Sequence, residues 1–256
     1  MPQLSYGQEM DAAFAGMKAD SRFDEVESFC AQEAIDFGVG VVKSDANPAT
    51  EVRLPNITQI VLTDNAGTFT AGDVGVTVNG TVVTETFATD KATTMTNLAA
   101  SIQALDTVKT AVYNNGAHTI TIVAANDVNL VVSTDVTAVT GSMTFAAPVG
   151  TCADTFRGIA LHTHQDNRTM PVLGSSVFGA TGYEAGAAVN VLRKGVAWVV
   201  VADAVALDAA VYLIPGATTN AQFTDETTSP NILVPTAKFR SSTSGAGIAK
   251  VEINIP

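Results

Sequence analysis

Alternation of apolar with polar residues is the commonest pattern along the chain, and it predicts a protein built mainly from β-strands. The C-terminus is the clearest case, because Val251, Ile253 and Ile255 alternate with charged or polar residues. Such alternation is typical of a strand that buries one face. Apolar runs at 38–42 and 209–214 predict two further strands. Short strands separated by Gly, Pro and Asp about every ten residues indicate a β-sandwich or barrel-like core.

Two apolar runs on either side of residue 195 predict a hairpin. Residues 188–192 and 196–201 are rich in Val and Ala, and Arg193, Lys194 and Gly195 separate them. A short polar segment with a glycine between two β-prone runs favours a tight turn. We therefore expect two antiparallel strands that are joined at 193–195.

The segment 74–87 carries the strongest local signal in the chain. Valines alternate over 74–78, Asn79 and Gly80 follow, and 81–87 is again rich in β-branched residues. Asn-Gly accepts the positive φ angles that a two-residue hairpin turn requires. The sequence therefore predicts a β-hairpin here.

A helix and two more strands are expected after this hairpin. Met95, Leu98 and Ile102 form one apolar stripe at helical spacing. Alternating or continuous apolar runs at 119–124 and 128–132 predict strands. The resulting order is β-β-α-β-β, which is a small α+β unit with one helix to cover a sheet.

The N-terminus has a different pattern. Residues 1–36 contain two sets of apolar residues at helical spacing: Met10, Phe14 and Met17 at i, i+4 and i+7, and Phe23, Val26 and Cys30 at i, i+3 and i+7. We expect an N-terminal arm with some helix over 1–36. The alternative is that this segment forms the first layer of the core.

The net charge of −12 is unevenly distributed, and this divides the chain. Residues 1–36 hold eight acids and two bases, residues 58–147 hold seven acids and two bases, and the remainder is nearly neutral. The middle segment also has 20 of the 33 threonines and no arginine. This shift predicts an inserted α+β domain over 58–147, called the module below. Residues 1–57 and 148–256 then form a β-rich core.

Composition also excludes several classes of protein. The chain is 46% hydrophobic and only 15% charged, which is the opposite of a disordered composition. The 13 Lys and Arg residues are outnumbered by 25 acids, so no nucleic-acid partner is expected, since binding a phosphate backbone needs clustered bases. No apolar run is long enough to span a bilayer. We therefore expect no membrane partner, and no signal peptide.

One histidine pair is the sharpest candidate for chemistry. His162 and His164 are two positions apart, so on a strand both imidazoles would share a face and could bind one metal ion. Gly158, four residues before the first histidine, agrees with the cupin pattern. Cupins place a Glu a few residues after the second histidine, whereas here the nearby carboxylate is Asp166, and His118 lies in the module. Without a third ligand, the simpler interpretation is a surface or loop histidine pair that binds no metal.

Other reactive residues have ordinary explanations. Cys30 and Cys152 show no metal or redox spacing and fit buried free thiols in a reducing cytosol. The acidic runs 24–27 and 225–226 lack the spacing of a calcium loop and fit solvated faces. No nucleophile elbow or phosphate-binding loop is present. The sequence therefore predicts no catalytic, cofactor-binding or metal-binding residue, and no cofactor.

Several glycine-containing and strand segments together resemble a known family. They are 33–42, 156–160, 182–183, 189–196, 208–212 and 247–254. Their order is similar to that of the structural cement, or capsid decoration, proteins of tailed bacteriophages. The resemblance covers 1–56 and about 149–256. The module departs from it and resembles the β-β-α-β-β modules of phage tail and other virion surface proteins.

The resemblance implies a mechanical rather than an enzymatic function. Proteins of this kind sit on the outside of the capsid, commonly as trimers, and clamp adjacent capsomers. The expected partners are therefore the major capsid protein and further copies of the same chain. The expected location is the outer capsid surface of a virion, after synthesis in the cytoplasm of the host bacterium. An acidic arm would complement a basic strip on the shell.

Two alternatives stay open at the level of sequence. The first is a head-fibre or tail-associated protein whose module binds a surface. The second is a metal-dependent enzyme of the cupin type that uses His162 and His164. Stoichiometric metal that is lost on changing His162 to Ala would favour the second.

Overall fold

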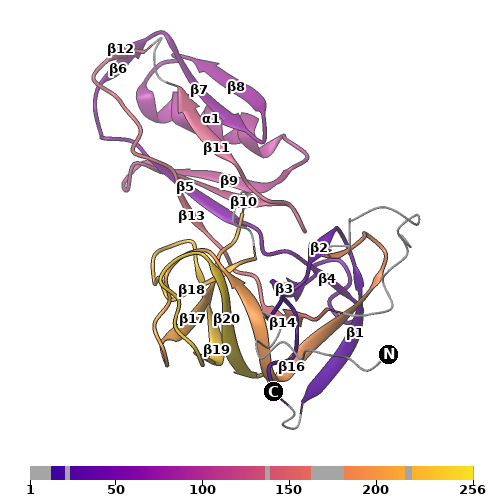
Figure 1. Ribbon diagram of the computed structural model, residues 1–256. Helices are drawn as coiled ribbons and strands as arrows, with labels where there is room; N and C mark the ends of the chain where they lie inside the picture. Colours follow the sequence, from indigo (N-terminus) through magenta and orange to yellow (C-terminus); the bar gives the residue numbers. More distant parts are fainter. Residues whose placement is uncertain (1–12, 21–23, 136–138, 163–181, 217–220, 256) are drawn as a thin grey trace, which may run out of the picture.

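The computed structural model describes residues 13–20, 24–135, 139–162, 182–216 and 221–255 of the 256-residue chain. These residues form twenty strands and one α-helix, so the expectation of a mainly β protein is confirmed. Figure 1 shows two bodies: the upper one holds the predicted module together with the short strand at 149–151, and the lower one holds the other strands of the predicted core. No helix among the described residues is long and apolar enough to cross a membrane.

The lower body is built on a nine-stranded sheet. Its strands are β1 (Glu25–Ala31), β3 (Gly40–Lys43), β4 (Glu51–Arg53), β14 (Phe156–Ala160), β16 (Ala188–Val201), β17 (Ala210–Leu213), β18 (Phe223–Thr224), β19 (Ile232–Phe239) and β20 (Gly247–Asn254). Beside it, β2 (Ile35–Asp36) pairs with β15 (Gly182–Tyr183). The strand at 38–42, the strand at 209–214 and the C-terminal strand are thereby confirmed as β3, β17 and β20.

Strand pairing closes this sheet into two rings that share β16. The first ring runs β1-β4-β3-β14-β16 and closes because β1 also pairs with β16. The second runs β16-β18-β17-β19-β20 and closes because β20 also pairs with β16. Closure removes free sheet edges, and it confirms the barrel-like core that the sequence predicts.

The hairpin expected at 188–201 is wrong, because β16 is one continuous strand of 14 residues. Lys194, in the expected turn, pairs with Glu25 of β1 on one side and Asn254 of β20 on the other. Gly195 takes a φ of +131°. Partners on both sides of the strand outweigh the local preference for a turn, which shows that tertiary pairing can override composition.

The helix expected in the N-terminal arm is also wrong for the part of 1–36 that the structure describes. Val26 and Cys30 lie in β1, and the backbone N–H groups of Gly16 and Ala19 donate to the carbonyls of Trp198 and Val196 at 2.8 Å each. These backbone groups bond to β16 instead of within a helix. Residues 13–20 and 24–31 are thus a layer of the core, the alternative that the sequence left open. Met10 and Phe23 lie outside the described residues.

The upper body has three small sheets and one helix. The elements are β5 (Gln59–Thr63), β6 (Phe69–Ala71), β7 (Asp73–Val78), β8 (Thr81–Thr86), α1 (Lys91–Gln103), β9 (Val108–Asn114), β10 (Thr119–Ala124), β11 (Val132–Asp135), β12 (Thr140–Gly141) and β13 (Val149–Thr151). The sheet orders are β13-β5-β10-β9, β11-β7-β8 and β12-β6. The helix α1 contacts β8 of one sheet and β9 and β10 of another.

The predicted hairpin and helix of the module are confirmed. β7 and β8 pair through a turn in which Asn79 and Gly80 have φ angles of 48° and 82°. The carboxylate of Asp90 accepts a 2.7 Å hydrogen bond from the N–H of Thr93 and caps α1. Met95, Leu98 and Ile102 are fully buried, as their spacing requires.

The two strands after the helix differ from the prediction. β10 (119–124) lies between β5 and β9, neither of which was predicted, and β11 begins only at Val132 and joins β7. The burial of β9 does not alternate cleanly, so its sequence lacks the period of a half-buried strand. The turn between β9 and β10 is built by Asn114, whose Oδ1 accepts from the N–H groups of Gly116 and Ala117 at 3.0 and 3.1 Å.

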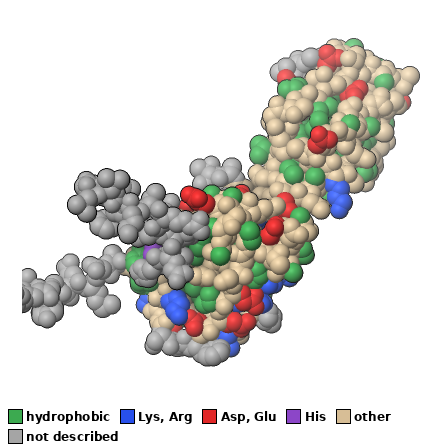
Figure 2. Space-filling model, turned by 90° about the vertical axis from the view of Figure 1, so that its right-hand side faces the viewer, with side chains coloured by type: hydrophobic (Ala, Val, Ile, Leu, Met, Phe, Trp, Pro, Cys, Tyr) green, Lys and Arg blue, Asp and Glu red, His purple; other side chains and the backbone are tan. Residues whose placement is uncertain are grey.

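Buried apolar side chains form two separate clusters. One contains residues from Phe29 to Val52 and from Phe156 to Ile253. The other contains residues from Ile60 to Met143. In the view of Figure 2, most Lys and Arg side chains lie on the lower body, and the upper body shows mainly uncharged side chains. Each body therefore has its own apolar interior.

Candidate functional site

His162 lies in an aromatic cluster. Its imidazole centroid is 4.8 Å from that of Phe14 and 4.6 Å from that of Phe37, which in turn is 5.2 Å from Tyr183. The backbone N–H of His162 donates to the carbonyl of Gly16 at 2.9 Å. This surrounding fits a packing role for His162, which differs from the surface or loop position that the sequence favoured. His164 lies outside the described residues.

The structure does not bring the histidines and acids together into a metal site in the part of the chain that it describes. No three His, Cys, Asp or Glu side chains are grouped there to hold a metal ion. His118 lies beside the buried Asp64, with Nδ1 3.6 Å from Oδ1 and no hydrogen bond between them, whereas Lys91 Nζ donates to the same Oδ1 at 2.6 Å. Lys91 thus balances the charge of Asp64 within the module.

The cysteines and acidic runs have structural surroundings. Burial, followed by the nearby charge of Asp154, raises the pKa of the Cys152 thiol to about 12. Cys30 is exposed rather than buried, which contradicts the expectation of two buried thiols. Glu27 of the first acidic run accepts from two arginines, and Asp225 of the second accepts from the N–H of Ala206 at 2.9 Å. These acids therefore have partners in the fold and are not simply solvated.

A buried arginine joins the two bodies. Arg53, at the end of β4, has a side chain that is only 1% exposed. Its Nε donates to Asp127 at 2.7 Å, and Nη1 and Nη2 donate to the two carboxylate oxygens of Asp154 at 2.9 and 2.8 Å. Nη2 also contacts Asp45 at 3.2 Å, and Nη1 also donates to the carbonyl of Leu54 at 2.9 Å. All five guanidinium donors therefore have an acceptor.

Asp127 is the module's contribution to this network. It lies between β10 and β11 at a φ of 60°. Besides Arg53, its carboxylate accepts from the N–H of Asp45 at 2.7 Å, from Gln32 Nε2 at 3.0 Å and from Ser44 Oγ at 3.2 Å. Burial raises its pKa, but these hydrogen bonds outweigh burial and lower the pKa to about 2. For Arg53, hydrogen bonds and the charges of the carboxylates outweigh burial and raise the pKa.

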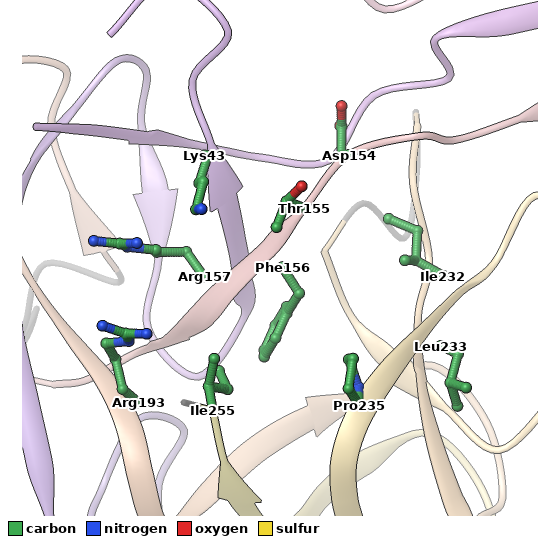
Figure 3. A pocket seen from close by; sticks show the side chains of 10 residues that line it. All are labelled: Lys43, Asp154, Thr155, Phe156, Arg157, Arg193, Ile232, Leu233, Pro235 and Ile255. Atoms are coloured by element: carbon green, nitrogen blue, oxygen red, sulfur yellow. The ribbon is translucent and has the colours of Figure 1, made fainter. Parts of the chain in front are cut away.

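A groove of about 440 Å³ lies between the two rings of the lower body (Figure 3). One wall carries the cations Lys43 of β3, Arg157 of β14 and Arg193 of β16. The opposite wall is apolar and consists of Ile232, Leu233 and Pro235 from β19. Phe156 and Ile255 lie between the two walls in Figure 3.

Two arginines of the cationic wall are held by Glu27 of β1. Arg157 Nη2 and Arg193 Nη1 donate to the two oxygens of Glu27 on β1, at 3.3 and 2.9 Å. The guanidinium carbon of Arg157 also lies 4.5 Å from the ring centroid of Phe29, a cation–π distance. Pairing of β1, β3, β14 and β16 brings these side chains together. Sequence reasoning missed them because they come from four strands and form no motif.

These features define a class of protein: a β-rich protein with two closed rings, a separately packed α+β body and a groove with one cationic wall. The family whose sequence profile matches is described as structural cement protein (E217 gp24/Pam3 gp6), and the match spans residues 104–254. Since this is more than half of the chain, the protein belongs to the phage structural cement family. It is therefore a capsid-associated structural protein.

The matched range begins directly after α1 and includes β9 and β10 of the module. The match therefore covers the second segment of the sequence resemblance, from about 149 on, and also extends over 104–147 of the module. A chain in the solved structure of the capsid of Myoviridae Phage XM1 is 14% identical, with a TM-score of 0.44. The similarity covers 98% of this chain and 95% of that chain. No curated protein matches the sequence.

Proposed function

We propose that the protein binds the outside of a phage capsid and stabilises the shell by clamping adjacent capsomers. The match to the structural cement family over 104–254 carries this proposal. The role is mechanical and not enzymatic. The partners are the major capsid protein and further copies of this chain, arranged as a homo-oligomer and expected as a trimer. Repetition of one contact over the shell multiplies a modest affinity.

The two bodies have different roles in this proposal. The core, residues 1–57 and 148–256, is the part that contacts the shell, and the module, 58–147, faces outward on the virion. Two separate apolar clusters support this division. The Arg53 network supports a fixed attachment of one to the other, because it fastens Asp127 to the core. The protein is made in the host bacterial cytoplasm and ends on the outer capsid surface.

Binding to shells tests the proposal. Expanded shells of the parent phage, assembled without this protein, would be mixed with the purified chain and sedimented. We expect saturable co-sedimentation at a fixed ratio to the shell protein. The decorated shells should also withstand a higher temperature before they disassemble. Cryo-electron microscopy of the virion should place the protein on the head. Density on the tail, or no effect on shell stability, would contradict the proposal.

A further inference from the structure

The groove between the two rings has walls of opposite character, which points to an occupant that is amphipathic. We propose that it binds an extended segment of the shell protein that carries an Asp or Glu next to apolar side chains. This inference rests on the proposed function and names the chemistry of its contact. Lys43 and Arg157 meet the carboxylate, and Leu233 and its neighbours on β19 meet the apolar side chains.

The cationic wall has unused capacity for an anion. Lys43 is half-buried, and no hydrogen bond or ion pair joins its ammonium to another described residue. On the same wall, Arg157 and Arg193 both pair with the carboxylate of Glu27. Asp154, at the rim, is already bound to Arg53. A carboxylate that enters the groove would therefore find a cation that the fold has left available, and charge-assisted hydrogen bonds are the stronger kind.

The apolar wall argues for a peptide segment. Leu233 is 53% exposed although it lies on a strand of a closed ring, and it stands beside Ile232 and Pro235. Contiguous exposed apolar side chains usually mark an interaction site. A nucleic-acid backbone offers nothing to this wall, and 25 acids oppose its approach.

The net charge of this chain counts against a second copy as the occupant of the groove. Each copy carries a net charge of −12, so two copies repel at long range. The groove is a local exception to that charge, with its cations within reach of an incoming carboxylate. Electrostatic complementarity of this kind sets register and partner choice.

Charge reversal at Lys43 is the primary test. Lys43→Glu should weaken binding to expanded shells by about tenfold or more, because it places a carboxylate where one must bind. Lys109→Glu is the matched control, since Lys109 is an exposed lysine on β9 of the module. It should change binding less than about twofold. Lys43→Met keeps the aliphatic stem and provides a second variant, for which a smaller loss is expected.

The apolar wall has its own matched pair. Leu233→Ser should weaken binding, whereas Val112→Ser, at a valine of β9 that is 60% exposed, should not. Because both side chains are exposed, circular dichroism melts of the two variants should match the parent protein. If Lys43→Glu and Leu233→Ser bind as well as their controls, the inference is overturned while the proposed function stands. If the parent protein itself does not bind shells, both fall.

Photo-cross-linking identifies the occupant directly. p-Benzoylphenylalanine would replace Leu233, and the bound particles would be irradiated and digested for mass spectrometry. We expect a cross-link to one segment of the shell protein with an Asp or Glu close to the site of attachment. A cross-link to another copy of this chain, to a segment without an acidic residue, or to nothing in bound particles overturns the inference.

Discussion

At the scale of single residues, Arg53 is the side chain on which the most depends. Three carboxylates from separate parts of the chain meet its guanidinium, and it is almost fully buried. A buried ion pair adds little net stability when intact, but removal of one partner leaves charges buried without compensation. Removal of the Arg53 side chain should therefore lower the free energy of unfolding by more than the intact ion pairs add to it.

We expect Arg53→Met to lower the free energy of unfolding by about 3–5 kcal/mol, because Asp127 and Asp154 lose their countercharge. Urea denaturation at neutral pH measures this loss. Arg240→Met is the comparison, since Arg240 binds Glu252 and Asp208 at the surface. It should have a much smaller effect, and equal losses for the two variants would contradict the argument.

Asp127 makes stability depend on pH in the acidic range. Its pKa is lowered to about 2 in the folded protein, compared with about 3.9 in an unfolded chain. A depressed pKa contributes stability that is present above pH 4 and is lost as the pH falls toward 2. The contribution at neutral pH is about 3 kcal/mol. Unfolding free energies measured between pH 5 and 2 should show this slope, and Asp127→Asn should flatten it.

The two cysteines should differ in reactivity. Cys30 is exposed, whereas burial and the charge of Asp154 raise the pKa of Cys152 to about 12. Because the thiolate is the reactive form, iodoacetamide at pH 8 should label the native protein once. Mass spectrometry should locate the label on Cys30, and Cys30→Ser should abolish it. Labelling of native Cys152 at a comparable rate would show that its site is open.

At the scale of elements, β16 joins the two rings. Any other residue at Gly195 of this strand would have a strained backbone. The φ of +131° at Gly195 is one that side chains rarely adopt. An added Cβ there would also lie 3.1 Å from the Cβ of Asp24. Substitution should therefore disturb both rings through one position.

We expect Gly195→Ala to lower the free energy of unfolding by about 1–3 kcal/mol. Gly247→Ala is the matched control, because an added Cβ at this strand position meets nothing within 4 Å. Its effect should stay within about 0.5 kcal/mol. Chemical denaturation of both variants checks the difference, and similar midpoints would show that the backbone at Gly195 relaxes.

Elements with local causes could be predicted from the sequence. The turn at Asn79 and Gly80 and the stripe of α1 are set by neighbouring residues, and the structure has both. β16 could not be predicted, because its continuity through Lys194 depends on strands that are far away in sequence. The same reason hid the site. Lys43, Arg157 and Arg193 become neighbours only through strand pairing.

At the scale of the whole molecule, part of the acidic charge behind the net −12 is paired with bases inside the fold. Lys18 pairs with Asp24, and Glu27 binds two arginines, so part of the N-terminal acidity is neutralised within the core. This weakens the expectation that the segment 1–36 offers its acids to a basic strip on the shell. In the groove the charges are the other way round: this protein supplies the cation and the shell protein supplies the carboxylate.

The shared strand β16 has a consequence for how the molecule responds to mechanical load. Antiparallel hydrogen bonds run across the strands, so tension along β16 loads the bonds to β1 and β20 in shear, many at once. Its two halves are bonded to different rings, and neither ring can be drawn away without sliding against this strand. With the proposed clamping role, a force that separates neighbouring shell subunits would meet this resistance along β16, where the bonds are loaded together and not one after another.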